Sequence, residues 1–140
     1  MSTDHLDVAY GIGRSLARAA VWHGERCNWM GPGSEVDRGS AVTLSALGTD
    51  LYEGTSGVAY FLAELYAATG AAELKRTALG ALRQALTRAV TDAEYAPGMY
   101  LGTTGIAVAA VHVGARLGQD WLVEQALRLI GRETAADPDA

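Results

Sequence analysis

The sequence has few of the residues on which several protein classes depend. Among its 140 residues there is one cysteine, Cys27, so no disulfide can form within the chain. Acidic side chains outnumber basic ones, and the net charge of −5 argues against a nucleic-acid-binding surface. No uninterrupted apolar run reaches the roughly eighteen residues that a membrane span needs. The polar start, Met1–Asp4, lacks the features of a signal peptide, so we expect a cytoplasmic protein.

Motifs for catalysis are also missing. The sequence contains neither a Gly-x-Ser-x-Gly nucleophile motif nor a Gly-x-x-x-x-Gly-Lys phosphate loop. His23 and Cys27 are four residues apart, with Glu35 and Asp37 nearby, but two loop ligands are too few for a zinc site. His112 falls within an apolar stretch, where a core histidine is more usual than a ligand. The sequence therefore identifies no catalytic residue and no metal ligand, and it leaves the roles of these histidines and of Cys27 open.

An internal repeat is the strongest positive signal. The segment LYEGTSGVAYFL at residues 51–62 returns as MYLGTTGIAVAA at residues 99–110. The offset of 48 residues continues downstream without a gap, from Gly70 to Gly118 and from Leu82 to Ile130. We call the two segments the repeat heads; their shared tyrosines and glycines are Tyr52, Gly54, Gly57, Tyr100, Gly102 and Gly105. A fixed period of this size indicates stacked helical units.

Each unit is expected to contain two helices. An apolar run follows each head and ends at Gly70 or Gly118, which suits a helix that is buried on most sides. A glycine at that position can adopt the left-handed conformation that ends a helix. An amphipathic helix then follows, as the stripe Leu74, Ala78 and Leu82 indicates. The pattern predicts an inner apolar helix, a short turn and an outer amphipathic helix.

The residues of the repeat heads have a structural and a functional interpretation. The first glycine can adopt a positive φ, and Thr55 or Ser56 can cap the helix that follows. The second glycine, in the first helical turn, would let a neighbouring helix come close. A Gly-x-x-Gly turn at a helix N-terminus also suits an anion. Because phosphate sites are rarely duplicated in a helical repeat, we favour the interpretation as a turn and packing device.

The domain organisation follows from these signals. We expect one partial domain over residues 1–140. Its predicted parts are a lead-in helix at 4–23, a loop at 24–48, repeat one at 49–91, repeat two at 97–132 and a tail at 133–140. Gly11 and Gly13 weaken the lead-in helix, and we interpret them as positions of close helix packing. The tail reads as a linker to a further head, which the period would place near residue 150.

The stretch LYEGTSGVAYFLAELYAATG resembles the lanthionine synthetase C-like cyclases. The resemblance includes both repeat heads, and the upstream segment from Ile12 to Trp29 resembles the lead-in helix of the fused synthetases. It implies an all-α fold, the α/α toroid, in which a ring of inner helices is surrounded by outer helices. This chain would form an incomplete toroid, with a lead-in helix and two inner–outer pairs. The resemblance therefore identifies it as the N-terminal part of a cyclase.

The family's activity is the addition of a cysteine thiol to a dehydroamino acid in a precursor peptide, which forms a thioether ring. Zinc lowers the thiol pKa in that reaction. The family's ligands lie in Trp-Cys and Cys-His-Gly motifs, and neither motif occurs in this sequence. We expect no cofactor in this chain, although the full-length family uses zinc. The chain alone is expected to be inactive, with the remaining C-terminal cyclase portion or an oligomer partner and the precursor peptide as its partners.

Two other interpretations remain open. The chain could be a non-catalytic helical-repeat module that binds a peptide or a protein. It could instead belong to another enzyme class built on the α/α toroid, such as a glycosidase, which needs paired carboxylates. Glu53 is the one acidic residue in either repeat head, so we favour this interpretation least. The sequence does not decide between a natural short product, one piece of a split enzyme and a fragment.

Overall fold

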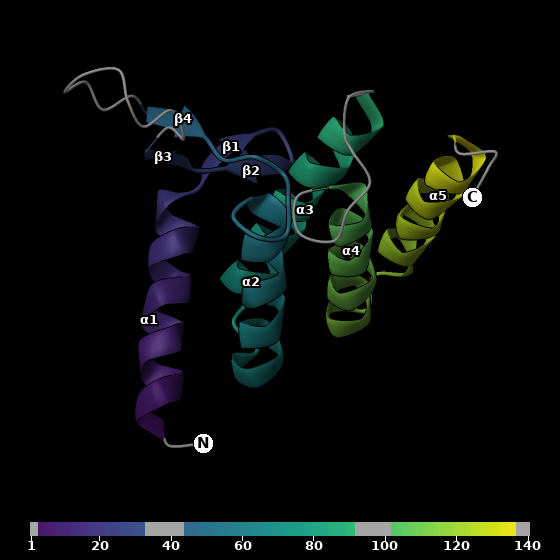
Figure 1. Cartoon of the computed structure of the whole chain (residues 1–140). Helices are drawn as coiled ribbons and strands as arrows, with labels where there is room; N and C mark the ends of the chain where they lie inside the picture. Colours follow the sequence, from purple (N-terminus) through teal and green to yellow (C-terminus); the bar gives the residue numbers. More distant parts are fainter. Residues whose placement is uncertain (1–2, 33–43, 92–101, 137–140) are drawn as a thin grey trace.

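The computed structural model describes residues 3–32, 44–91 and 102–136, and helices make up most of them (Figure 1). The helices are α1 (Thr3–Ala19), α2 (Thr55–Thr69), α3 (Ala72–Thr91), α4 (Thr103–Leu117) and α5 (Asp120–Ala136). Figure 1 shows α1, α2 and α4 in a row, with α3 behind α2 and α4 and with α5 at the C-terminal edge. The prediction of an all-α, incomplete helical-repeat fold is confirmed.

The lead-in helix is shorter than predicted. α1 ends at Ala19, and Val21–His23 forms strand β1 instead of a last helical turn. β1 pairs in antiparallel fashion with β2 (Arg26–Asn28), and Gly24 in the turn has a φ of 63°. This left-handed conformation favours glycine, which explains its place between the two strands.

The predicted loop at 24–48 was also wrong in its described part. Besides β2, it contains β3 (Met30–Pro32) and β4 (Leu44–Ala46), which form a second antiparallel pair. Each strand has three residues. Such strands are too short to show the period-two alternation by which a strand is recognised in a sequence.

The first hairpin, formed by β1 and β2, and Trp29 directly after it pack against the helices. Trp29 is buried, and its indole N–H donates a hydrogen bond to the carbonyl oxygen of Leu16 at 2.8 Å. On α3, a Cβ at Gly80 would lie 2.6 Å from the Trp22 ring and 2.9 Å from the Sγ atom of Cys27. Gly80 therefore creates the space in which the hairpin packs against α3.

Both repeats have the predicted order of an inner helix, a glycine turn and an outer helix. Gly70 ends α2 with a φ of 72°, and Gly118 ends α4 with a φ of 67°, as expected for helix-ending glycines. The outer helices α3 and α5 follow each turn directly. α5 continues to Ala136, so the first residues of the predicted tail at 133–140 are helical rather than a linker.

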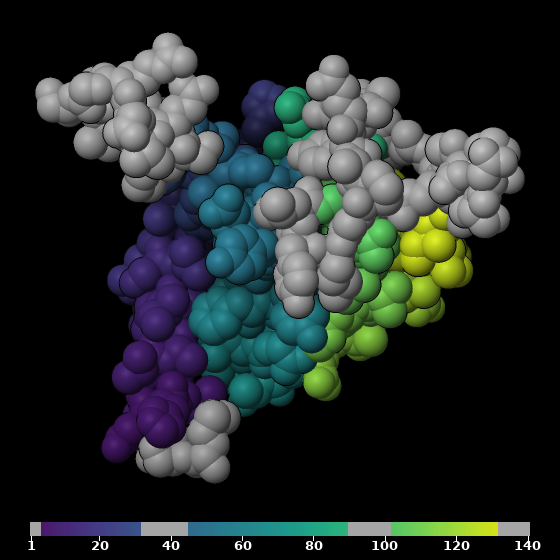
Figure 2. Space-filling view, in the orientation of Figure 1, coloured from purple at the N-terminus to yellow at the C-terminus, as the bar shows by residue number. Residues whose placement is uncertain are grey.

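Small residues bring the helices close together. The core contains many fully buried alanines, among them Ala59, Ala63 and Ala110. A Cβ at Gly13 would lie 2.3 Å from the Leu65 side chain, so this glycine lets α1 approach α2, and Figure 2 shows the two helices in contact. Gly11 has nothing within 4 Å of such a Cβ, so the packing interpretation is wrong for that glycine. Among the described helices, none has the length and apolarity needed to cross a membrane.

Candidate functional site

The first repeat head needs glycine for a reason other than the predicted positive φ. Gly54 precedes α2 with a φ of −114°, and Gly102 precedes α4 with a φ of −125°; both are extended. A Cβ on Gly54 would lie 2.5 Å from both the amide nitrogen of Asp50 and the carbonyl oxygen of Gly48. The predicted positive φ was therefore wrong, and close backbone approach explains the glycine.

The second glycine of that head has a similar role. A Cβ on Gly57 would lie 2.2 Å from the carbonyl oxygen of Leu51, which belongs to the turn that leads into α2. The sequence had suggested that an adjacent helix comes close to this glycine. The close neighbour is instead the backbone of the head itself. Gly105 is buried at the corresponding place in α4, whereas Tyr100 lies outside the described residues. Tyr52 is 74% exposed.

The hydroxyl groups of Thr55 and Ser56 do not cap α2, so the predicted capping was wrong. Ser56 instead donates to the carbonyl oxygen of Thr49, which ties the start of α2 to the preceding turn. The Oγ1 atoms of Thr55 and Thr103, which are equivalent in the two repeats, are buried and have no hydrogen-bond partner among the described residues.

The charge around the first head does not favour an anion. The Asp50 carboxylate accepts a hydrogen bond from the amide of Glu53 at 2.8 Å, so negative charge already lies at the N-terminus of α2. The amides of Gly54 and Thr55 donate to the carbonyl oxygens of Asp50 and Gly48. These contacts support the interpretation of the head as a turn and packing device.

Polar side chains meet between the two inner helices, where α2 and α4 pack together. The rings of Tyr60 and His112 stack with their centroids 3.7 Å apart and their planes 8° from parallel. Glu64 Oε1 lies 2.8 Å from Arg116 Nε and 2.5 Å from His112 Nε2. The Arg116 hydrogen bond, together with the charges of Arg116 and His112, holds the pKa of Glu64 below its ordinary value. His112 of repeat two therefore contacts Tyr60 and Glu64 of repeat one.

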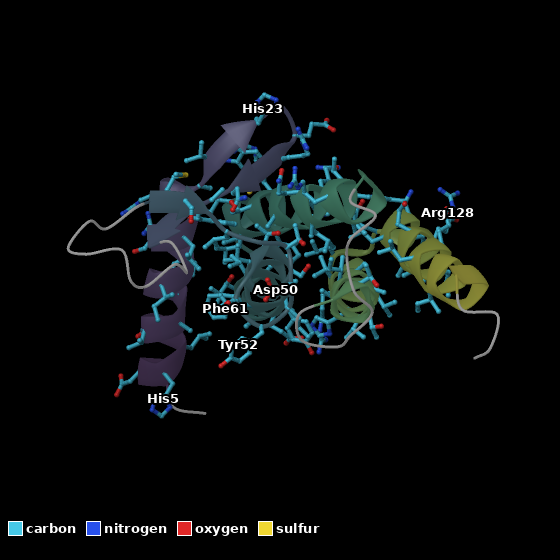
Figure 3. The ribbon with its side chains drawn as sticks, turned by 45° about the horizontal axis from the view of Figure 1, so that its top comes forward. His5, His23, Asp50, Tyr52, Phe61 and Arg128 are labelled. Carbon is cyan, nitrogen blue, oxygen red and sulfur yellow. The ribbon has the colours of Figure 1, made fainter. Side chains whose placement is uncertain are left out.

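The hairpin separates His23 and Cys27, two of the metal-ligand candidates that the sequence suggested in this region. Cys27 faces Trp22 across the hairpin, whereas His23 faces Arg26, so neighbouring positions place the two side chains on opposite faces. His23 is exposed, and Figure 3 shows it at the tip of the hairpin. Cys27 is buried, and its Sγ contacts the carbonyl oxygen of Thr77 at 3.5 Å.

The described residues do not fit a zinc ion. Burial raises the pKa of the Cys27 thiol to about 12, so it remains protonated at neutral pH and is a poor metal ligand. Within residues 3–32, 44–91 and 102–136 there is no group of three or more histidine, cysteine, aspartate or glutamate side chains that could hold a metal ion. Glu35 and Asp37 lie outside the described residues.

One face of repeat two is uncovered where the same face of repeat one is covered. Ala63 on α2 is fully buried, whereas Val111, its equivalent 48 residues further on, is 42% exposed on α4. Leu82 on α3 is fully buried, whereas its equivalent Ile130 on α5 is 44% exposed. We call the exposed apolar positions the open face; they are Val108, Val111 and Ile130.

A pocket of about 440 Å³ lies on the open face. Its walls are mostly apolar and include Val108, Val111 and Ala115 of α4 and Ile130 of α5. Tyr60 and His112 also line it, so the stacked pair between α2 and α4 forms one side of the pocket. An apolar pocket beside exposed valine and isoleucine side chains is typical of a surface that another element covers.

Comparison with protein families agrees with this arrangement of repeats. The family model "Lanthionine synthetase C-like protein" matches residues 45–139, a range that includes both repeat heads and all four repeat helices. The match begins after α1, so the resemblance of the upstream segment stays a prediction. No curated protein matches the chain. Because the family model covers more than half of its residues, the chain belongs to the lanthionine synthetase C-like family.

Proposed function

We propose that this chain supplies two repeats of a lanthionine cyclase toroid and that further repeats pack against its open face. The proposal rests on a difference in burial between two equivalent positions. Ala63 is buried in repeat one, whereas Val111 is exposed in repeat two. In repeat one, this face is covered by α4, the inner helix of the next repeat. The partner that fits the open face is therefore another inner–outer helix pair, on the same or on a second polypeptide.

The reaction proposed for the completed toroid is thioether formation in a precursor peptide. A cysteine thiol adds across the carbon–carbon double bond of a dehydroalanine or dehydrobutyrine, so one C–S and one C–H bond form and no atom is lost. Zinc, when bound by a cyclase of this family, supplies the lowered thiol pKa. Because the described residues do not fit zinc, the ligands have to come from the added repeats.

The role of this chain in that assembly is structural. α2 and α4 form part of the inner wall, and the contacts of Glu64 with His112 and Arg116 fix one inner helix against the next. The buried, protonated thiol of Cys27 does not compete for zinc or for a dehydrated peptide. A lone free cysteine also suits the reducing cytoplasm, which is the compartment we propose.

Reconstitution tests this function. The chain is mixed with a polypeptide that carries the remaining repeats of a family member, including the Trp-Cys and Cys-His-Gly motifs, and with a dehydrated precursor peptide. Ring formation leaves the peptide mass unchanged but protects its cysteines from alkylation, which mass spectrometry measures. We expect protection only when both polypeptides are present.

Matched variants separate assembly from chemistry. Val111→Glu on the open face is expected to abolish protection, whereas Val8→Glu, at an exposed site on α1, leaves it intact. Protection by this chain alone would contradict the proposal. Assembly of the two polypeptides without ring formation would also contradict it, and would favour a non-catalytic helical-repeat module.

A further inference from the structure

Two adjoining pockets lie where the first hairpin meets the outer helices. One, of about 660 Å³, lies between the hairpin and helices α3 and α5, and its lining includes Arg26, Arg83 and Trp121. The other, of about 360 Å³, lies between the hairpin and α3, and its lining includes Trp22 and Arg76. The two pockets share Gly24, Glu25 and Arg83, so they form one continuous depression, which we call the outer groove.

The outer groove concentrates positive charge in an acidic protein. Four cationic side chains line it, and none forms an ion pair within the described residues. They are Arg26, Lys75, Arg76 and Arg83. Elsewhere, Arg14 and Arg116 pair with carboxylates. Among the described residues, Glu25 is the one carboxylate that lines either pocket, so the groove has an excess of cations although the chain carries a net charge of −5.

Two tryptophans hold guanidinium groups in the groove. The Arg76 guanidinium carbon lies 4.0 Å from the centroid of the Trp22 ring, and that of Arg83 lies 5.2 Å from the Trp121 ring. A guanidinium over an aromatic face loses little of its hydrogen-bonding capacity because its N–H groups point outward in its own plane. Such a group binds a carboxylate through two parallel hydrogen bonds.

We propose that the outer groove binds an acidic peptide segment in an extended conformation. Arg76 and Arg83 are seven residues apart on α3, which corresponds to roughly 10 Å along the helix axis. An extended peptide covers that distance in about three residues. Its side chains alternate between two faces, so two carboxylates two or four positions apart lie on one face and can reach both guanidinium groups. Leu79 and Leu86 line the groove on the same helix and provide apolar contact for the side chains between them.

The length and charge of the groove favour a peptide over other anions. A single phosphate or small carboxylate would contact one guanidinium group and leave the rest of the groove empty. A nucleic acid would carry a high charge density toward a protein of net charge −5, whose cations here are confined to one groove beside Glu25. A peptide with a few carboxylates and apolar residues between them matches both the cations and the leucines.

The outer groove is separate from the open face. No described residue that lines the groove also lines the pocket on the open face. The peptide-binding proposal therefore goes beyond the proposed function and does not depend on completion of the toroid.

Fluorescence anisotropy tests this proposal with the complete 140-residue chain. The probe is a short fluorescein-labelled peptide in which glutamates alternate with leucines, and a serine separates each of these residues from the next. Its control is the same peptide with glutamine in place of glutamate. We expect saturable binding of the acidic probe and no binding of the control, because charge-assisted hydrogen bonds require the carboxylates.

Variants identify the site of binding. Arg83→Gln and Arg26→Gln, on two different elements of the groove, are each expected to weaken binding about tenfold, which corresponds to the loss of one charge-assisted contact. Arg18→Gln, which removes the same charge on α1, leaves the affinity unchanged. Circular dichroism verifies that each variant is folded. An equal loss in all three variants would overturn the proposal, and so would binding of a labelled single-stranded oligonucleotide in preference to the acidic peptide.

Discussion

Repeat one and repeat two contain the same order of elements, yet they are packed differently. α2 in repeat one lies between α1 and α4, whereas α4 in repeat two has α2 on one side and the open face on the other (Figure 1). Equivalent positions consequently differ in burial, as Ala63 and Val111 do. The apolar pattern of a repeat therefore indicates which face can be buried, and the neighbouring repeat determines whether that face is buried.

The sharpest test of this difference places a charge at the two equivalent positions. Ala63→Glu buries an unpaired carboxylate between packed helices and is expected to lower the free energy of unfolding by at least about 3 kcal/mol. Val111→Glu places the same charge on the open face, where a surface substitution costs about 0.5 kcal/mol or less. Urea unfolding followed by circular dichroism measures both. Equal losses would show that the two faces are not different.

The repeat heads provide the next largest effect. Gly57→Ala introduces a Cβ 2.2 Å from the carbonyl oxygen of Leu51, and the backbone shift that follows should destabilise the chain by about 1–3 kcal/mol. Gly11→Ala is the matched control because a Cβ there meets nothing within 4 Å, and it should stabilise α1 by roughly 0.5–1 kcal/mol. Opposite signs in denaturant unfolding would support the account. A neutral Gly57→Ala would mean that the turn can relax.

The sequence was sufficient for the parts of the fold that depend on local pattern. The 48-residue offset predicted both helix pairs, and Gly70 and Gly118 predicted where the inner helices end. It was insufficient where distant residues decide the conformation. The three-residue strand β2 packs beside α3, where Cys27 contacts Thr77 across fifty positions, and no local window contains that contact.

The candidate sites show the same limit. The glycines of the first head were identified correctly, but their reason was not, because the close contacts of Gly54 with Asp50 and Gly48 depend on the course of the turn. His112 was interpreted as a core residue, and its contacts with Tyr60 and Glu64 could only be seen once α2 and α4 were side by side. In the sequence, the one indication of the contact between Glu64 and His112 was that they occupy equivalent positions, 48 residues apart.

A third prediction concerns Cys27, which lies outside both repeats. Its pKa of about 12 in the folded chain exceeds the ordinary value of 9.0, so the unfolded chain loses the thiol proton first. Stability is therefore unaffected below pH 9 and decreases as the pH rises from about 9 toward 12. Urea midpoints measured over this range should decrease less in Cys27→Ala than in the unaltered chain. The same decrease in both would exclude the thiol as its cause.

The smallest expected effect belongs to Glu64, which links the two repeats. Glu64→Gln removes the charge that faces Arg116 and His112, and we expect a slight, salt-sensitive loss of stability because the site is partly exposed. The folded-state pKa of Glu64 lies below its ordinary value of 4.5, so its contribution is present at neutral pH and is lost as the pH falls through the lowered pKa. Urea midpoints at pH 7 should differ between the two chains and converge in acid. A difference that persists unchanged in acid would contradict the ion-pair account.

The most direct test of the open face is a chain extended by a third repeat. A copy of residues 92–139 placed after Asp139 continues the 48-residue period and brings a further inner helix beside α4. We expect a higher free energy of unfolding in a single cooperative transition, and we expect Val111→Glu to become as destabilising as Ala63→Glu. An extended chain that is no more stable, in which Val111→Glu still costs almost nothing, would contradict the claim that this face accepts the next repeat.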